Sequence, residues 1–167
     1  MQLNSALYKL PSMTKQRTPA EIPSRDAALQ LDQQLCFALY SANLAMHKLY
    51  RGLLKTLDLT YPQYLVMLVL WEGGACTVGA IGERLFLDSA TLTPLLKRLQ
   101  AGGLVTRERS ADDERQVVVR LTTAGRALRN KAGAVPEQVF CAAACSLQEL
   151  RQLKQQLETL RGNLGGG

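Results

Sequence analysis

The residues best able to do chemistry are a thiol, Cys36, and the tyrosines that follow it at positions 40, 50, 61 and 64. Cys36 and Tyr40 are four residues apart, so a helix places them on one face. Cys36 and Tyr50 are separated by nearly four whole turns, which puts them on one face but about 21 Å apart. A phenol that donates a hydrogen bond to a thiolate favours the charged form. Tyr50 cannot give that bond to the thiol of its own helix.

The remaining cysteines are Cys76, Cys141 and Cys145. A chain of 167 residues can build its own core without disulfides, so we expect reduced thiols at rest. Cys141 and Cys145 lie one turn apart on the predicted penultimate helix, and even with His47 they supply too few ligands for a metal. No metal and no cofactor are therefore expected. A lone cysteine on an apolar helix face is mostly inert filler, which is how we interpret Cys76.

Charge and hydropathy narrow the class of protein. The formal net charge of +6 and the isoelectric point of about 9.4 make an anionic partner plausible. The longest apolar run, residues 64–71, is far shorter than the roughly 20 residues needed to cross a bilayer. The N-terminal residues lack the apolar core of a signal peptide. We therefore expect a cytoplasmic protein without a membrane segment.

The pattern of apolar residues predicts one folded domain between two tails. Residues 26–57 carry apolar side chains at helical spacing and contain no proline, which predicts one long helix. Thr60 and Gln63 form a capping box that begins a second, buried helix. We therefore expect a flexible tail at residues 1–25, one domain at residues 26–161 and a disordered tail at residues 162–167. Within the domain, dimerisation helices are expected at residues 26–57 and 123–161. The last helix is expected to begin at the capping box formed by Ser146 and Glu149.

Between the long helices, residues 61–121 predict a helix-turn-helix followed by a hairpin. Two short helices, at residues 77–86 and 90–100, are joined by a tight turn in which Ser89 is the expected cap. The runs LVTRERS and RQVVVRLT then alternate like strands around the polar turn ADDE. The expected fold is therefore mainly α, an α+β winged helix-turn-helix with long dimerisation helices at both ends.

Basic and hydroxyl side chains gather on the second short helix and the hairpin. A helix in the major groove reads bases with its N-terminal residues, and basic side chains hold phosphates. Any solvated amphipathic helix could look similar, but four arginines within fourteen positions of the hairpin favour DNA. Asp113 either anchors the guanidinium of Arg115 or caps the turn. The candidate DNA contacts are Ser89, Thr91, Thr93, Lys97, Arg98, Arg109 and Arg115, with Asp113 positioning the wing.

The hairpin sequence SADDERQVVVRLTTAG resembles the wing signature of the MarR family of dimeric winged-helix regulators. In that signature an Asp-x-Arg precedes alternating apolar residues and Leu-Thr-x-x-Gly, and here Asp113, Arg115, Leu121, Thr122 and Gly125 stand in those places. The resemblance covers roughly residues 30–161. It implies that Arg115 enters the minor groove and that the helix at residues 90–100 is the recognition helix.

Within that family, the segments LCFALYSA, KLYRGLLKTLDLTYPQYLVMLVLWE and LDSATLTPLLKRL resemble the OhrR branch, the sensors of organic hydroperoxides. The resemblance implies that Cys36 is the sensing thiol, that Tyr50 and Tyr61 are its hydrogen-bonding partners, and that Tyr40 lies nearby. Because Tyr50 cannot reach Cys36 within one helix, the site must be shared by a homodimer. A C-terminal cysteine implies the two-cysteine kind, with Cys141 as the expected resolving thiol and Cys145 as the alternative.

Together these features predict a repressor that binds a palindromic operator when reduced. It would dissociate when an organic hydroperoxide oxidises Cys36, and so derepress an organic hydroperoxide resistance gene. One alternative keeps the fold but releases DNA on binding a phenolic or drug ligand. The other is a thiol-dependent peroxidase, although nothing in the sequence supplies an electron-donor site, so we do not expect an enzyme.

Overall fold

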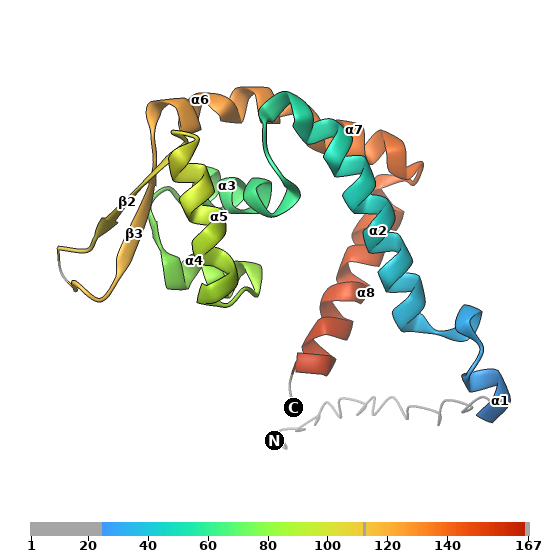
Figure 1. Ribbon diagram of the computed structural model, residues 1–167. Coiled ribbons are helices and arrows are strands. Elements are labelled where there is room, and N and C mark those ends of the chain that lie inside the picture. The colour runs from blue at the N-terminus through green and yellow to red at the C-terminus, as the bar shows by residue number, and fades with distance from the viewer. Residues whose placement is uncertain (1–24, 112, 166–167) are drawn as a thin grey trace, which may run out of the picture. The chain divides into compact units, whose positions relative to one another are not determined.

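The computed structural model describes residues 25–111 and 113–165 of the chain (Figure 1). The chain divides into two compact units, residues 1–41 and 42–167. The expected flexible tail, residues 1–25, lies outside the described residues except for Arg25, and residues 166–167 lie outside them too. Among the described helices, none combines the length and apolar character that crossing a membrane requires.

In the first unit, the expected continuous helix at residues 26–57 is broken. The chain forms α1 (Arg25–Ala28), a 3₁₀ turn η1 (Leu31–Gln33) and the start of α2 (Leu35–Leu53). Gln30 and Gln34 adopt extended ψ angles of 131° and 114°, and the Gln34 side chain donates to the carbonyl oxygen of Ala28. A side chain that serves backbone acceptors in this way competes with helix formation. The helical pattern alone could not show that break.

The second unit contains the helix-turn-helix, as predicted. After the 3₁₀ turn η2 (Leu54–Leu57), α3 (Tyr61–Gly73) begins at the expected capping box, where Gln63 Oε1 accepts from the Thr60 amide at 2.8 Å. Next come α4 (Val78–Leu85) and α5 (Ser89–Ala101). The cap of α5 is Asp88 and not Ser89, because Asp88 Oδ1 accepts from the Thr91 amide at 2.6 Å.

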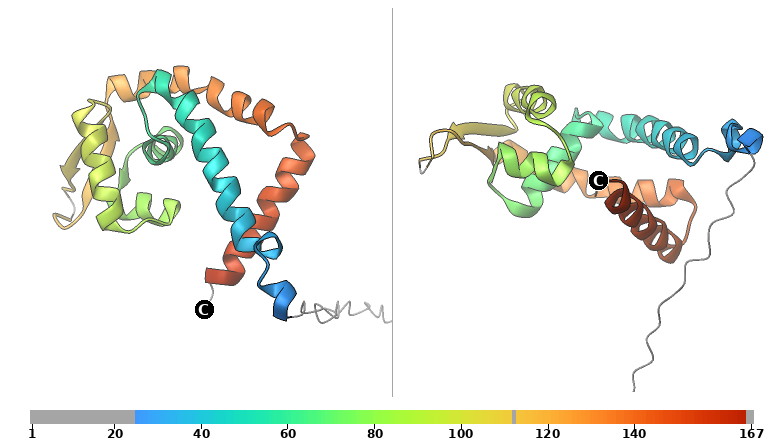
Figure 2. Two further views of the ribbon diagram at one scale, coloured as in Figure 1. Left: turned by 45° about the vertical axis from the view of Figure 1, so that its right-hand side comes forward. Right: turned by 90° about the horizontal axis from the view of Figure 1, so that it is seen from below.

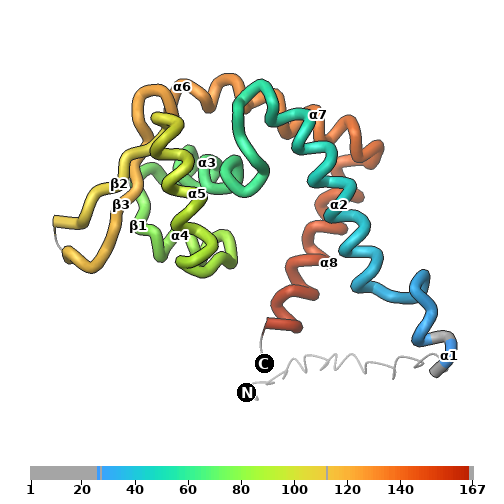
Figure 3. The backbone as a smooth tube through the Cα atoms, viewed as in Figure 1, coloured from blue at the N-terminus to red at the C-terminus, as the bar shows by residue number. Residues whose placement is uncertain are grey.

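The wing is a three-stranded antiparallel sheet. The predicted hairpin is β2 (Val105–Arg109) paired with β3 (Val117–Leu121), and it projects beyond the helix-turn-helix in both views of Figure 2. A short strand that we did not predict, β1 (Cys76–Thr77), pairs with the other edge of β3, so the order is β1-β3-β2 (Figure 3). Through β1 the sheet is joined directly to the start of α4.

Apolar side chains of α3, α4, α5 and the sheet form the core. Ile81 of α4 is buried with the apolar residues of α5, and Val78, Leu85 and Leu95 are half-buried against them. α3 contributes most of the remaining buried surface, which agrees with its almost uniformly apolar sequence. The largest fully buried side chains are Leu54, Val66, Met67, Leu70, Ile81, Leu92, Leu96, Leu99, Val105 and Val119.

The C-terminal part consists of three helices where we expected two. The predicted helix at residues 123–145 is split into α6 (Thr123–Ala132) and α7 (Ala134–Ala143). Pro136 explains the split, because it has no N–H to donate to the carbonyl of Ala132, four residues earlier, and its ring crowds that carbonyl. The last helix, α8 (Leu147–Gly165), begins at the expected Ser146 box but continues past the predicted end at Arg161. The disordered tail predicted from residue 162 is therefore helical through Gly165.

Hydrogen bonds of Thr122 and Gly125 hold the base of the wing against the start of α6. The Thr122 hydroxyl donates to the Gly103 carbonyl at 2.6 Å and accepts from the Gly125 amide at 3.0 Å. The Gly125 carbonyl accepts from the Trp71 indole at 2.8 Å, which ties the same junction to α3. A β-carbon on Gly125 would overlap the carbonyl oxygen of Leu104. These contacts explain why the Leu-Thr-x-x-Gly signature has a threonine and a glycine at these two positions.

Gly125→Ala should lower the free energy of unfolding by about 1–3 kcal/mol, because the added methyl overlaps a fixed backbone carbonyl. Gly52→Ala is the matched control, since a β-carbon there meets nothing within 4 Å in an α-helix and should stabilise the helix by up to about 1 kcal/mol. Urea denaturation at one protein concentration measures both. Equal stability of Gly125→Ala and wild type would contradict the close contact.

Candidate functional site

Three tyrosines of the second unit form one cluster. Tyr50 comes from the end of α2, and Tyr61 and Tyr64 come from the first turn of α3. The ring centres of Tyr50 and Tyr61 are 4.3 Å apart, and those of Tyr50 and Tyr64 are 6.0 Å apart. The chain reverses between the helices at Asp58, whose φ of 52° is left-handed. The structure therefore brings together two of the predicted phenols and adds a third.

The surroundings of these phenols raise their pKa values. The pKa of Tyr50 is raised to about 12, mainly by burial and further by the neighbouring Tyr61 and Tyr64. Burial also raises the pKa of Tyr61 and the pKa of Tyr64 above the ordinary 10.0. A phenol must keep its proton to donate a hydrogen bond. The cluster is consequently a set of donors throughout the neutral and mildly alkaline range.

Aromatic contacts extend the cluster on both sides. The ring of His47, the single histidine, lies 5.3 Å from that of Tyr61. The Trp71 ring lies 6.2 Å from that of Tyr64 in an edge-on arrangement. Tyr64 itself is only 3% exposed, which is why an apolar helix pattern concealed its place in the site. Its spacing of three residues from Tyr61 was the available signal.

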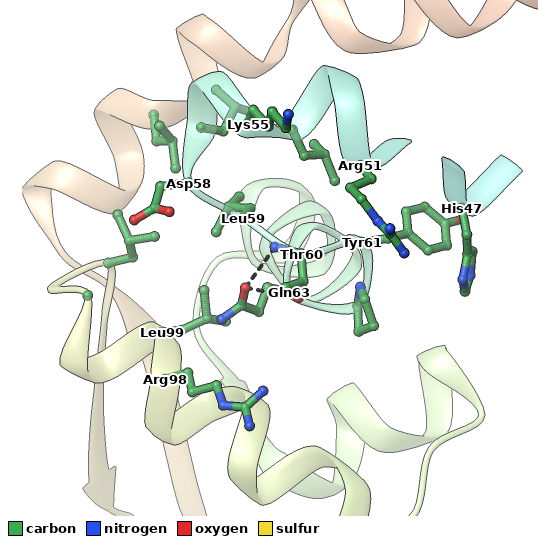
Figure 4. A pocket seen from close by; sticks show the side chains of 16 residues that line it. His47, Arg51, Lys55, Asp58, Leu59, Thr60, Tyr61, Gln63, Arg98 and Leu99 are labelled. Atoms are coloured by element: carbon green, nitrogen blue, oxygen red, sulfur yellow. Dashed lines mark hydrogen bonds between the residues drawn. The ribbon is translucent and has the colours of Figure 1, made fainter. Parts of the chain in front are cut away.

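A cleft of about 720 Å³ opens beside Tyr61 (Figure 4). Its walls carry three cationic side chains, Arg51, Lys55 and Arg98, and one carboxylate, Asp58. Leucine side chains of η2, α5 and α6 also line it. The cleft can accept a small molecule that combines an apolar body with an anionic group.

The sensing thiol predicted at Cys36 stands in the first turn of α2, because the helix begins at Leu35 and not at residue 26. Cys36 is exposed, and Tyr40, one turn further along the helix, is 60% exposed. The N–H groups of a helix's first turn favour negative charge beside them. The break that the sequence pattern missed therefore places the thiol at a helix N-terminus.

The two C-terminal cysteines occupy different structures, contrary to the expectation that they share one helix. Cys141 lies in the last turns of α7. Cys145 lies beyond the end of α7, after Ala144, whose φ of 50° is left-handed, and its thiol donates to the Ala143 carbonyl at 3.1 Å. Both cysteines are exposed. Cys141 is therefore held by a helix, and Cys145 by a turn.

The predicted DNA contacts lie on two faces of α5 and on the wing. Thr93 and Arg115 line a cleft beneath the wing, whereas Arg98 lines the cleft beside Tyr61. Asp113 Oδ1 accepts from the Arg115 amide at 3.0 Å and its Oδ2 accepts from the Gln116 side chain at 3.1 Å. Of the two roles we considered for Asp113, the structure has the turn cap. Ser89, Thr91, Lys97 and Arg109 are exposed.

Unfolding above pH 10 should report the buried phenol of Tyr50. Its pKa is raised from 10.0 to about 12 in the folded chain, so the stability it contributes is fully present below pH 10 and is lost as the pH rises through about 12. Tyr50→Phe should therefore lose less stability across this window than wild type does. The control is Tyr40→Phe, which removes an exposed phenol. Urea titrations across this pH range measure the difference, and parallel curves for all three proteins would contradict it.

The chain matches the family described as transcriptional regulator SarA/Rot over residues 48–132. The HTH-type transcriptional regulator TtmR of Methylorubrum extorquens (strain PA1) is 51% identical, over 84% of this chain and 72% of that protein. The organic hydroperoxide resistance transcriptional regulator of Bacillus subtilis (strain 168) is 48% identical, over 79% of this chain and 90% of that protein.

Among solved structures, reduced AbfR bound to DNA has a TM-score of 0.69 and 37% identity, covering 83% of this chain and 97% of that chain. Overoxidised AbfR bound to DNA has a TM-score of 0.68 with 37% identity, covering 83% and 98%. Disulfide-formed AbfR has a TM-score of 0.58 with 39% identity, covering 81% and 95%. The winged-helix fold is thus confirmed, and the chain belongs to the MarR and SarA family of transcriptional regulators, in the branch of the organic hydroperoxide resistance regulators.

Proposed function

We propose that the chain is a redox-sensing transcriptional repressor, a homodimer that binds a palindromic operator when reduced and leaves it when an organic hydroperoxide oxidises Cys36. The observation that carries the proposal is the pair of protonated phenols, Tyr50 and Tyr61, in a chain 48% identical to a regulator named for organic hydroperoxide resistance. Release derepresses a resistance gene. A regulator of this kind acts where the DNA is, in the bacterial cytoplasm.

The chemistry begins with the Cys36 thiolate. Its sulfur attacks one peroxide oxygen, so an S–O bond forms, the O–O bond breaks, and the alkoxide leaves as an alcohol after it takes a proton. Cys36 becomes a sulfenic acid, and the hydroperoxide is reduced. A second thiol then attacks the sulfenic sulfur, which forms a disulfide and releases water. In a sensor this oxidation is stoichiometric, whereas a peroxidase turns over its substrate.

The sensing site is shared by two protomers. Tyr50 and Tyr61 pack together at the far end of α2 from Cys36, so the phenols that serve a thiolate come from the partner subunit. Exposed apolar side chains on α2, namely Leu35, Leu39, Leu44 and Met46, support a partner along this helix. A protonated phenol can donate to the thiolate and later to the departing alkoxide.

Cys141 of the partner subunit is our choice of resolving thiol. It projects from a helix and is exposed. The Cys145 thiol already donates to the Ala143 carbonyl within a turn, which is an arrangement it would have to leave. A disulfide needs Cα atoms about 5–6 Å apart, so closing one with Cys36 pulls on the end of α7. The existence of AbfR in a disulfide form supports a switch of this type.

α8 offers a route from the cysteines to the DNA-binding helices. The Arg161 guanidinium lies 4.3 Å from the centre of the Phe86 ring, in a cation–π contact. Phe86 ends α4 in a left-handed conformation with φ of 56° and begins the short turn that leads to α5. A displacement of α7 that carries α8 with it would therefore act on the turn that sets the recognition helix. Such a shift changes the spacing of the two recognition helices in the dimer and releases the DNA.

The cleft beside Tyr61 favours one second candidate, release by a small anionic ligand. Its cationic and apolar walls suit a phenolic or drug-like acid. That function differs from redox sensing in one respect that can be measured: ligand release does not need the Cys36 thiol. Hydroperoxide treatment of a variant that lacks this thiol therefore separates the two functions.

Cys36→Ser should bind DNA like wild type but ignore hydroperoxide. The probe is a duplex that wild-type protein selects from a random pool, and cumene hydroperoxide is the oxidant. Treatment should weaken wild-type binding by at least about tenfold, or about 1.4 kcal/mol, and leave the variant unchanged. A mobility shift measures both. Hydroperoxide-dependent release by Cys36→Ser would reject redox sensing at this residue and favour the ligand-controlled alternative.

Cys141→Ser should abolish the intersubunit disulfide. Oxidised wild type should run on a non-reducing gel as a covalent dimer of two 18.3 kDa chains, because the bond joins different protomers. Cys145→Ser is the matched control and should still form this dimer. Mass spectrometry should find sulfinic and sulfonic acid at Cys36 in Cys141→Ser, since no thiol protects the sulfenic acid. The opposite pattern in the two variants would assign resolution to Cys145.

A further inference from the structure

A cleft of about 550 Å³ lies beneath the wing, between the first turn of α4, the helix α5 and the strands β2 and β3. Two arginines line it, Arg107 of β2 and Arg115 beside the wing turn. Thr93 of α5 and Gly79 of α4 also line it, and Glu83 is the one carboxylate among its lining residues. The cleft is therefore cationic and bordered by both DNA-binding elements of the winged helix.

The strand register fixes which arginine faces this cleft. Arg107 is paired with Val119, whose side chain is fully buried, so Arg107 lies on the core side of the wing. Thr106 is paired with Arg120, which places Arg120 on the opposite face of the same two strands. Arg107 and Arg120 therefore carry the same charge and belong to the same hairpin, but they lie on opposite faces of the sheet.

Arg107 carries an unpaired buried donor. Its Nε atom is buried and has no hydrogen-bond partner among the residues that the structure describes. Buried polar groups in native proteins are almost always paired, and leaving a donor of a charged group without a partner costs more than leaving a neutral one. Since Arg107 lines the cleft, its partner can come from a molecule that enters the cleft.

The expected course of the DNA backbone indicates which molecule would enter the cleft. If α5 lies in the major groove and the wing tip in the neighbouring minor groove, the sugar-phosphate backbone that separates the two grooves must cross between α5 and the wing. The cleft beneath the wing lies at that place. A β-carbon on Gly79 would meet only the Thr77 hydroxyl at 4.0 Å, so the backbone of α4 is open to close approach.

We infer that the cleft beneath the wing seats one backbone phosphate of the operator, and that Arg107 is its principal ligand. This inference rests on the proposed DNA-binding function and adds to it a residue and a site. Guanidinium and phosphate form charge-assisted hydrogen bonds in a paired geometry, and the unpaired Nε is one of the donors such a pair uses. Arg115 contributes charge at the mouth of the cleft, and Thr93 borders it from α5.

The test is the salt dependence of DNA binding, because each lost phosphate contact lowers the slope of log K against log salt by about 0.9. Arg107→Gln removes one contact in each protomer of a homodimer, so the slope should fall by about 1.8. The loss of affinity should be equal for the selected operator and for a scrambled duplex, since phosphates carry no sequence information. Fluorescence anisotropy over a potassium chloride series measures both quantities.

Two further variants separate a phosphate contact from a structural effect. Arg107→Lys keeps the charge and should retain most of the slope. Arg120→Gln removes the same charge from the opposite face of the wing and should leave the slope as in wild type. A slope for Arg107→Gln equal to that of wild type overturns the inference, and so does an equal fall in Arg120→Gln. If wild type itself binds no selected duplex, the proposed function fails instead.

Discussion

Burial of α3 is the constraint on which the second unit depends. Val66, Met67 and Leu70 are fully buried, so the helix can neither rotate nor slide without opening the core. Its first turn carries Tyr61 and Tyr64 against Tyr50, and its last turns carry Trp71, which donates to the Gly125 carbonyl. The positions of the phenols and of the base of the wing are thus set by one packed element, which connects the tyrosine cluster to the winged helix.

The base of the wing is attached to helices on both sides. Thr122 and Gly125 fasten β3 to α6, and β1 joins the other edge of β3 to the start of α4. Asp113 then closes the wing turn through the Arg115 amide. In the proposed switch, a change at the cysteines would therefore move the winged helix as a whole and not bend it, because a packed core transmits displacement better than it deforms.

Periodicity and capping residues predicted the helix-turn-helix, the hairpin and the start of α3, since each has a strong local signal. They failed where two local signals compete. Asp88 and Ser89 are both good caps, and only the structure shows that Asp88 accepts a hydrogen bond from the Thr91 amide. β1 is two residues long and exists only because β3 offers an edge, which no local pattern reveals. In the site, the resemblance indicated Tyr50 and Tyr61, but Tyr64 was hidden by its apolar surroundings.

The break before α2 changes how the thiol should be understood. As the middle of a long helix, Cys36 would face water with no backbone N–H free to approach it. As the second residue of α2, it stands at a helix N-terminus, where the Phe37 and Ala38 amides donate to the Gln34 carbonyl. In the proposed dimer the partner's phenols would hydrogen-bond to the thiolate at this helix end and serve the leaving alkoxide. The proposed site thus combines a helix end of one protomer with phenols of the other, so it exists only when two chains assemble.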